Sequence, residues 1–494
     1  MELQFKKQSL SCLRRVRREP AIQELTQEVR LTDGMPDIGR VLCCWGQMII
    51  RGKEWRGDTV SVVGGAMVWI LYAPEDGTEP RCIDAWIPYQ LRWEHMDAER
   101  EGPLRLSPLL RFVDARTISA RKFMVRAGVA AMAEALCPGQ AELYSPEEVP
   151  EDVELLRRIY PVRLPMEAGE KTFQMDEELN LNGVQKLMSY TLRPEITDCR
   201  VLANKVVFRG VGKLHLVYCC TEGRIRTSDF EVPFSQFAEL ENTYSPDARA
   251  DICFGTTLLE LDMEDGKLRL KCGLVAQYLV DDRELVELVE DAYSPRRMVK
   301  VQSEALNLPS ILEDRTENIT ASQTASGHRG EVVDVNFLPD FPRQRQTADG
   351  VELEMPGMFQ TLYYGEDGTL QSANTRWESR MEMPAGEDSR IDSMVLPQGE
   401  PQAMQSADGF DLNSQMLLKL RTSSDAGLPM VTGLEVGEMQ EPDPGRPSLI
   451  LCRPGGETMW EIAKRTGSTM EAIQQANDLQ EELPSNRMIL IPVP

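Results

Sequence analysis

Residues 71–77 read LYAPEDG, and the same pattern returns as VYCCTEG at residues 217–223 and as LYYGEDG at residues 362–368. The tyrosine of the pattern recurs after 146 and then after 145 positions. A repeat of nearly constant period indicates several copies of one structural unit. We therefore predict that the chain contains three copies of one domain.

Each copy of the pattern indicates a β-hairpin. Apolar side chains occupy alternate positions before the tyrosine, as Val68 and Ile70 do in the first copy, which is the period of a half-buried strand. The acidic residue and the glycine at the end favour a turn, because glycine tolerates a positive φ and a short acidic side chain can bond the nearby backbone. Further hairpin turns are expected at residues 52–57, 265–266 and 408–409.

The length of 494 residues is too great for one hydrophobic core, so several domains are expected. We predict a multidomain, mainly β fold, with three β-rich domains in series and a small C-terminal domain of the order strand, helix, helix, strand. The predicted domains are residues 1–165, residues 166–325 and a divergent third copy at 326–440, followed by a linker at 441–446 and the C-terminal domain at 447–494.

Other segments carry less specific expectations. The first two copies share a Pro-acidic-Ile triplet, at residues 36–38 and 194–196. The glycines of residues 210–212 lack the third glycine of a dinucleotide-binding loop and are expected at a strand-edge turn. Residues 147–158 are expected to be helical or connecting, and residues 384–400 to form a mobile loop.

The C-terminal domain contains two helix starts. Thr458 and Glu461 have the spacing of a capping box, in which the hydroxyl accepts from a backbone amide and the carboxylate bonds back. Ser468 and Glu471 repeat that spacing. Gly467 between them is a suitable last residue for the first helix. A strand is expected before the first helix and another after the second.

The residues of this domain resemble the LysM family. GETMW at residues 456–460 is followed by IAKR, by ANDL and by a terminal ILIP, as in that family. The resemblance implies a shallow groove for peptidoglycan or N-acetylglucosamine oligomers, between the first strand–helix loop and the loop after the second helix. Carried over, the groove residues are Gly456, Glu457, Thr458, Met459, Asn477, Asp478, Leu479 and Gln480.

An alternative for the same residues is that they only cap and pack the helices, and that the surface docks a protein. Two departures from the family support it. The turn before the first helix contains an additional glycine, at 455 or 456, and the last loop reads PSN at residues 484–486 where Pro-Gly is common.

The segment DGMPDIGR at residues 33–40, together with the repeated β-rich unit, resembles the SPOCS domain of clostridial spore-coat proteins. The resemblance is clearest in the first copy. Three such units followed by a LysM domain resemble coat morphogenetic proteins of that family. This implies a sporulation protein made in the mother cell, which helps to localise coat components at the forespore surface or spore coat. The implied partners are the spore-coat morphogenetic ATPase and other coat proteins.

The net charge of −25 argues against general attraction to nucleic acid or to an anionic membrane, because both require a positive surface. A basic run within residues 6–18 is expected to be a solvated face or a docking patch.

The first residues lack the apolar stretch of a secretory signal, and no stretch approaches the roughly 18 apolar residues of a membrane span. We therefore predict no nucleic-acid partner and no transmembrane segment. A generic cell-wall-binding protein, the competing class, would normally need export.

The sequence contains no recognisable arrangement of catalytic or metal-binding residues. His95, His215 and His328 lie in different segments without metal-site spacing. Residues 34–40 space two glycines like a P-loop but lack its Lys-Ser/Thr. The eleven cysteines show no C-x-x-C spacing and are expected to be reduced and mostly buried. We predict a non-enzymatic protein without a cofactor or a metal, with a peptidoglycan hydrolase as the enzymatic alternative.

Overall fold

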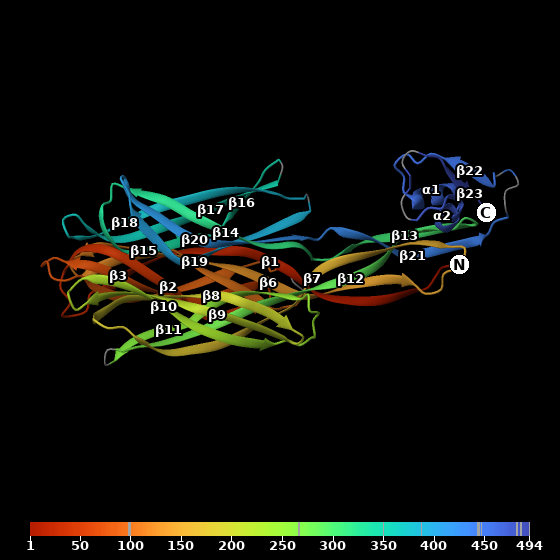
Figure 1. Ribbon diagram of the computed structural model, residues 1–494. Helices are drawn as coiled ribbons and strands as arrows, with labels where there is room; N and C mark the ends of the chain where they lie inside the picture. Colours follow the sequence, from red (N-terminus) through yellow and green to blue (C-terminus); the bar gives the residue numbers. More distant parts are fainter. Residues whose placement is uncertain are drawn as a thin grey trace.

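The computed structural model describes residues 1–96, 100–264, 267–348, 350–386, 388–441, 445, 447–480, 483–484 and 487–493 (Figure 1). These residues form antiparallel β-sheets and, near the C-terminus, two short helices. The predicted mainly β fold is therefore confirmed. The predicted turn at residues 265–266, most of the linker at 441–446, and Ser485 and Asn486 of the last loop lie outside the described residues.

The first copy of the repeat is a sandwich of two three-stranded sheets. One sheet has the order β2-β3-β4 and the other the order β1-β6-β5. The strands are β1 (Phe5–Arg30), β2 (Ile38–Arg56), β3 (Thr59–Pro74), β4 (Arg81–Trp93), β5 (Leu104–Ser119) and β6 (Lys122–Pro146). Apolar side chains of both sheets meet between them, and Val68 of β3 and Phe123 of β6 are fully buried there. Alternation along each strand places these side chains on the inner face.

The second and third copies repeat this order of strands. In the second copy the sheets are β8-β9-β10 and β11-β12-β7; in the third they are β15-β17-β18, with β16 also on β17, and β14-β20-β19. The strands of the second copy are β7 (Glu154–Asn180), β8 (Val184–Leu202), β9 (Lys205–Cys220), β10 (Ile225–Glu239), β11 (Arg249–Glu264) and β12 (Lys267–Tyr293). Those of the third are β14 (Ser310–Ser326), β15 (Gly330–Pro339), β16 (Arg343–Gln346), β17 (Gly350–Gly365), β18 (Leu370–Pro384), β19 (Ser389–Gln405) and β20 (Gly409–Ser424).

The repeated sequence pattern forms the same turn in all three copies. Gly77, Gly223 and Gly368 have φ values of +73°, +78° and +73°, a region that favours glycine. Asp76 accepts bonds from the backbone N–H and the hydroxyl of Thr78, at 3.0 and 2.7 Å. Asp367 accepts the equivalent pair from Thr369, at 2.9 and 2.7 Å. The three hairpins predicted from this pattern are therefore present. The turn expected at residues 52–57 lies at the end of that range, at Gly57 with φ +57°, because residues 52–56 belong to β2.

The sequence predicts three copies in series. In the structure they instead pack side by side around a shared core (Figure 1). Each copy contributes to this core the first residue of its repeated pattern, which is Leu71 in the first copy, Val217 in the second and Leu362 in the third. These three side chains are at most 1% exposed. The outer face of each tyrosine-bearing strand is thus buried by the other copies. The alternation of apolar residues along the strand predicts only one buried face.

Long strands extend beyond the three sandwiches as a stalk. The ends of β1, β6, β7 and β12 run together with β13 (Arg297–Asn307) and β21 (Gly427–Met439), which pair with each other (Figure 1). Leu164 and Leu288 of the second copy pack there with Leu308 of the third and with Cys12 of the first. The stalk therefore has an apolar core built from all three copies.

Several expectations about connecting segments are wrong. Residues 154–158, expected to be helical or connecting, begin strand β7, and residues 389–400, expected in a mobile loop, belong to β19. The glycines of residues 210–212 lie inside β9, where the ring of Phe234 crosses Gly210. A Cβ at Gly210 would come within 2.5 Å of that ring.

The Pro-acidic-Ile triplets are not equivalent positions. Ile38 begins β2 and pairs with Pro74 at the repeated turn, whereas Ile196 pairs with Gly210, far from the turn of its own copy. The predicted domain boundaries remain predictions. The boundary at 165/166 falls inside β7, and that at 325/326 falls inside β14.

The C-terminal domain has the predicted order β22 (Leu449–Cys452), α1 (Met459–Thr466), α2 (Met470–Asn477) and β23 (Ile489–Pro492). Thr458 and Glu461 form the predicted capping box, and Gly467 ends α1 with φ +62°. The second cap differs by one residue. The N-cap of α2 is Thr469, whose hydroxyl accepts from Ala472, because the hydroxyl of Ser468 instead bonds the carbonyl of Pro492.

Candidate functional site

The two predicted sides of the groove come from the loop before α1 and from the end of α2. Gly456, Thr458, Asp478 and Gln480 are exposed, and Glu457, Asn477 and Leu479 are partly exposed. Met459 is only 6% exposed and lies in the core of the domain, against which Leu479 also packs. Two left-handed residues, Gly456 with φ +97° and Asp478 with φ +50°, shape the two loops.

Several predicted groove side chains are already held by the domain itself. The amide of Asn477 donates to Ile473 O at 2.8 Å and to Leu490 O at 2.6 Å, and its oxygen accepts from Leu490 N at 2.7 Å. This side chain therefore joins the end of α2 to β23. Glu457 binds Arg465 through both carboxylate oxygens at 3.0 Å.

Thr458 is occupied as the cap of α1. Its hydroxyl accepts from Glu461 N at 3.2 Å, and Glu461 Oε2 accepts from Thr458 N at 2.7 Å. The exposed side chains of Asp478 and Gln480, together with the backbone of the two loops, are the groups that a ligand in this groove would meet.

The domain is docked on the end of β12 in the stalk. Trp460 and Tyr293 pack edge to face with their ring centroids 4.7 Å apart. The indole N–H of Trp460 donates to Asp291 at 2.9 Å, and Lys464 pairs with the same carboxylate at 2.7 Å. The hydroxyl of Tyr293 donates to Ser468 O at 3.0 Å. These contacts join residues about 170 positions apart, so no local pattern in the sequence predicts them.

Asp291 gives this contact an electrostatic component. Partial burial of its carboxyl by itself raises the pKa, but the bonds from Lys464 and Trp460 outweigh burial and lower the pKa overall. The carboxylate therefore stays ionised and pairs with Lys464 at neutral pH. Docking uses one face of α1, and the groove residues Gly456, Thr458, Asp478 and Gln480 remain exposed.

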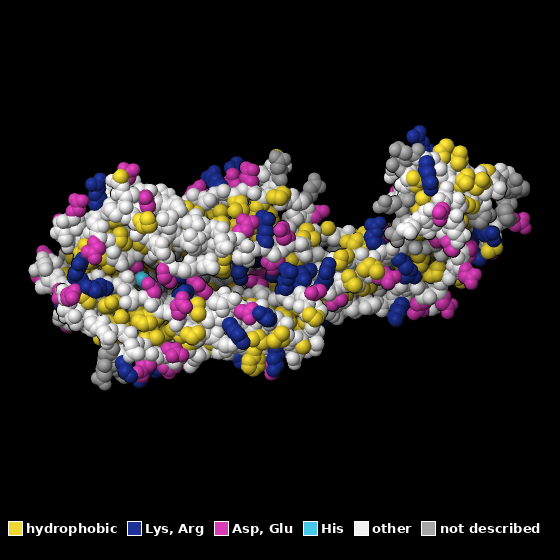
Figure 2. Space-filling model, in the orientation of Figure 1, with side chains coloured by type: hydrophobic (Ala, Val, Ile, Leu, Met, Phe, Trp, Pro, Cys, Tyr) yellow, Lys and Arg dark blue, Asp and Glu magenta, His cyan; other side chains and the backbone are white. Residues whose placement is uncertain are grey.

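The sheet of the C-terminal domain has an apolar outer face. Leu449 and Leu451 of β22 are 53% and 56% exposed, and Leu490 of β23, which pairs with Leu451, is 38% exposed. Figure 2 shows hydrophobic side chains gathered over these strands. Leu449 and Leu451 alternate with the inward Ile450, and this alternation is the sequence signal that could have identified the apolar outer face.

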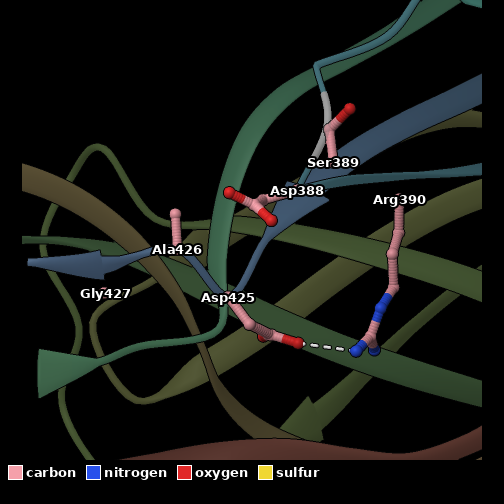
Figure 3. Close-up of a pocket in the computed structure, with 6 residues that line it drawn as sticks. All are labelled: Asp388, Ser389, Arg390, Asp425, Ala426 and Gly427. Carbon is pink, nitrogen blue, oxygen red and sulfur yellow. Dashed lines mark ion pairs between the residues drawn. The ribbon is translucent and has the colours of Figure 1, made fainter. Parts of the chain in front are cut away.

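A polar hollow of about 400 Å³ lies where β20 gives way to β21 (Figure 3). Its lining residues are Asp388, Ser389, Arg390, Asp425, Ala426 and Gly427. Arg390 and Asp425 form an ion pair at 2.8 Å, and their side chains are 61% and 50% exposed. Sites for small molecules are usually enclosed and mostly apolar, so this open, charged hollow does not have the character of one.

A buried ionic network joins the three copies. Arg105 of the first copy pairs with Glu134 at 2.6 Å and with Asp251 of the second copy at 2.5 Å. Asp251 also pairs with Lys419 of the third copy, at 3.0 Å. Burial by itself raises the pKa of Glu134, but Arg105, Arg15 and other cations lower it to about 2. The network is internally compensated, and we assign it a structural role.

Comparison with known families matches two segments of the chain. Residues 183–263 match the model described as "SipL, SPOCS domain", and residues 456–492 match the LysM domain. The first match spans β8 to β11 in the second copy, whereas the sequence resemblance is clearest in the first copy. The chain thus carries a SipL-type SPOCS domain and a C-terminal LysM domain. No curated protein and no solved structure matches it.

These two domain types suggest a spore-coat morphogenetic protein with a peptidoglycan-binding module. SPOCS domains are not known to be enzymatic, and neither match identifies a catalytic domain. Among the described residues, no helix is long and apolar enough to cross a membrane.

Proposed function

We propose that this chain, with its SPOCS and LysM domains, is a non-enzymatic scaffold of the spore coat whose LysM domain binds peptidoglycan through the groove between residues 456–459 and 477–480. The three packed copies form the rigid body of the scaffold. The LysM domain, fixed to the stalk, presents the groove to the glycan. Mother-cell synthesis and a position at the forespore surface or spore coat follow from the SPOCS resemblance.

The exposure of the groove in the docked domain is the observation that supports this proposal. Trp460 and Lys464 hold the domain on the stalk, while Gly456, Asp478 and Gln480 stay exposed. An N-acetylglucosamine unit needs backbone and side-chain partners for its acetamido group and a small apolar surface for its methyl. Leu479 supplies such a surface at the edge of the groove, since it is only partly buried.

Sedimentation with purified peptidoglycan tests the glycan proposal. The full chain should sediment, and a truncation ending at residue 440 should not. A double variant, Asp478→Asn with Gln480→Ala, should weaken binding roughly 3- to 10-fold per lost hydrogen bond. Asn tolerates the left-handed conformation of residue 478, so the loop should keep its shape.

Gln475→Ala is the matched control. Gln475 is exposed on α2 and bonds Glu471 at 2.9 Å, outside the proposed groove. Its removal should leave sedimentation unchanged. Equal binding by the double variant and wild type, with loss only on truncation, would place the glycan elsewhere in the LysM domain.

The proposed protein partners are the spore-coat morphogenetic ATPase and other coat proteins. Several modest contacts on one rigid body add through effective concentration, which suits a scaffold. A pull-down from a sporulating-cell extract should recover coat proteins with the full chain and also with the truncation ending at residue 440. Loss of every partner on truncation would show that the three copies do not make these contacts.

Docking of a coat protein by the LysM domain is the second candidate. It is favoured by the exposed apolar face of Leu449, Leu451 and Leu490. The double variant Leu451→Ser/Leu490→Ser should then lose a coat protein in the pull-down while peptidoglycan binding persists. Recovery of every coat protein by this variant would rule out docking through this face.

Two further alternatives have separate tests. A generic cell-wall-binding protein would sediment with peptidoglycan but recover no coat protein from the extract. A peptidoglycan hydrolase would give a lytic band in a cell-wall zymogram, and such a band would overturn the non-enzymatic proposal.

A further inference from the structure

Three side chains with metal-binding atoms converge where the second and third copies meet. His215 of β9 and Asp229 of β10 are directly opposite each other in the sheet, and Nδ1 of the imidazole lies 2.6 Å from Asp229 Oδ1. Glu400 of β19 reaches the same point from the third copy. One ligand atom from each residue lies within 4.8 Å of the other two. No pattern in the sequence connects these residues, because Glu400 is 185 positions from His215.

The other ring nitrogen of His215 faces a buried carboxylate. Nε2 lies 3.0 Å from Asp334 Oδ1, and the side chain of Asp334 is 3% exposed. Asp334 is held in turn by the indole N–H of Trp45, which donates to its Oδ2 at 2.8 Å. The contact is an ion pair and not an aligned hydrogen bond. A carboxylate on the far side of the ring is nevertheless common in histidines that bind metals, because it orients the ring and leaves the first nitrogen for the metal.

The backbone of the third copy is shaped to present Glu400. The pairing of β19 with β20 is interrupted between Gln398 and Gln402, and Gly399 takes φ +66° in this bulge. Arg193 of the second copy donates to Gly399 O at 2.5 Å and to Glu400 Oε1 at 3.3 Å. Bulges redirect side chains out of a regular strand, and this one directs Glu400 toward the second copy.

The surroundings of the imidazole favour positive charge. The charged groups that surround the ring and Glu400 are the carboxylates of Asp229, Asp334 and Glu195 and the cations of Arg193 and Lys213. The carboxylates thus exceed the fixed cations at this point.

We propose that His215 Nδ1, Asp229 and Glu400 form a binding site for a divalent first-row transition metal, in the first place Zn²⁺, which clamps the third copy to the second. One imidazole and carboxylate oxygens are ligands that such metals accept. Binding releases the Nδ1 proton to solvent, since a metal requires the deprotonated nitrogen. Asp334 is the positioning residue, because it acts through the ring.

Zinc titration of the untagged full chain, monitored by calorimetry and by thermal unfolding, tests this site. Wild type should bind one equivalent at the site and unfold at a higher temperature with Zn²⁺ than with a chelator. Glu400→Gln and Asp229→Asn should each weaken binding at least about 10-fold and lose the zinc-dependent rise. Asp334→Asn, which keeps an acceptor for Trp45, should weaken binding about 10- to 100-fold.

Glu231→Gln is the matched control. Glu231 lies two residues after Asp229 on β10, is exposed, and pairs with Lys213, so this variant removes the same charge without removing a ligand. Its zinc affinity should equal that of wild type. If Glu400→Gln and Glu231→Gln have equal effects, the response is general electrostatic attraction, and the site is wrong.

Cobalt substitution distinguishes this site from the cysteines. A cobalt complex with nitrogen and oxygen ligands should show weak visible bands that disappear in Asp229→Asn. A strong thiolate-to-metal charge-transfer band would place the metal on cysteine and overturn the proposal. Absence of zinc binding by folded wild type would also overturn it. Neither result bears on peptidoglycan sedimentation, because the proposed glycan groove lies in a different domain.

Discussion

Trp460 of the LysM domain packs edge to face against Tyr293 at the end of β12, with their ring centroids 4.7 Å apart and their planes at 74°. Both side chains are 5% exposed, so this contact belongs to a core shared by the LysM domain and the stalk. The LysM domain is therefore held in one orientation, in which the groove residues Gly456, Asp478 and Gln480 remain exposed.

Tyr293→Ala should release the LysM domain from the stalk. Loss of a buried aromatic ring costs about 3 kcal/mol, which reduces the ratio of docked to undocked molecules roughly 100-fold. The measurement is amide ¹⁵N relaxation of the LysM domain in the full chain. Its amides should tumble with the whole molecule in wild type and independently in the variant.

Tyr293→Phe is the control for Tyr293→Ala. It keeps the ring contact and removes only the bond to Ser468 O. We expect the domain to remain docked, with a loss of about 1 kcal/mol. Independent tumbling in wild type would contradict the docked arrangement.

Arg105→Met should destabilise the body of the protein by about 3 kcal/mol or more. The side chain of Arg105 is 7% exposed and pairs with Glu134 and Asp251, so its loss leaves two carboxylates with fewer partners in a buried site. Arg30→Met is the matched control, because Arg30 pairs with Glu28 at 71% exposure and should cost less than about 1 kcal/mol. Urea unfolding measures both. Similar losses of unfolding free energy in Arg105→Met and Arg30→Met would contradict the prediction, because they would show that the buried ion pairs of Arg105 contribute no more than an exposed pair.

The contribution of Glu134 should depend on pH in a defined direction. Its pKa is lowered from the ordinary 4.5 to about 2, so the ionised form stabilises the fold above pH 4.5 and this stabilisation disappears as the pH falls toward 2. Wild type should therefore exceed Glu134→Gln in unfolding free energy at pH 6, and the gap should narrow below pH 4.5. Glu142→Gln, at an exposed pair with Lys7, should show a much smaller gap. A gap for Glu134→Gln that stays constant between pH 6 and pH 2.5 would contradict the expected ionisation.

Cys43 and Cys44 should resist both alkylation and mutual oxidation in the folded protein. Adjacent side chains on a strand point to opposite faces, so Cys43 lies in the core shared by the three copies and Cys44 in the first sandwich. Burial raises the pKa of Cys44 to about 12 and that of Cys43 well above its usual value. Peptide mapping after brief alkylation should find the partly exposed Cys452 labelled before either. A disulfide between Cys43 and Cys44 in the native state would contradict this arrangement.

Local chemistry explains why parts of the fold were predictable. The repeated turn depends on a glycine and, in two copies, on an aspartate that bonds a threonine two positions later, as at Asp76 and Asp367. The helices of the LysM domain begin at hydroxyl caps and α1 ends at Gly467. Such features need only a few neighbouring residues. The cap of α2 was misplaced because Ser468 bonds the distant Pro492 instead.

The candidate groove was predicted from resemblance to LysM, and its residues remain a proposal. The structure adds which of them have other roles, since Asn477 joins α2 to β23 and Met459 fills the core. The stalk contact through Tyr293 and Asp291 was missed. Each of these residues looks like an ordinary strand residue until the LysM domain is placed beside it.

The three repeats, their hairpin turns and the strand–helix–helix–strand order of the LysM domain can be predicted from the amino-acid sequence, because short-range hydrogen bonds and alternation specify them. The shared core of the three copies, the stalk formed by their long strands and the meeting of His215 with Glu400 become visible only in the folded chain. Those arrangements depend on burying surfaces from residues more than a hundred positions apart, and no local pattern of polarity specifies which distant surface will cover a given strand.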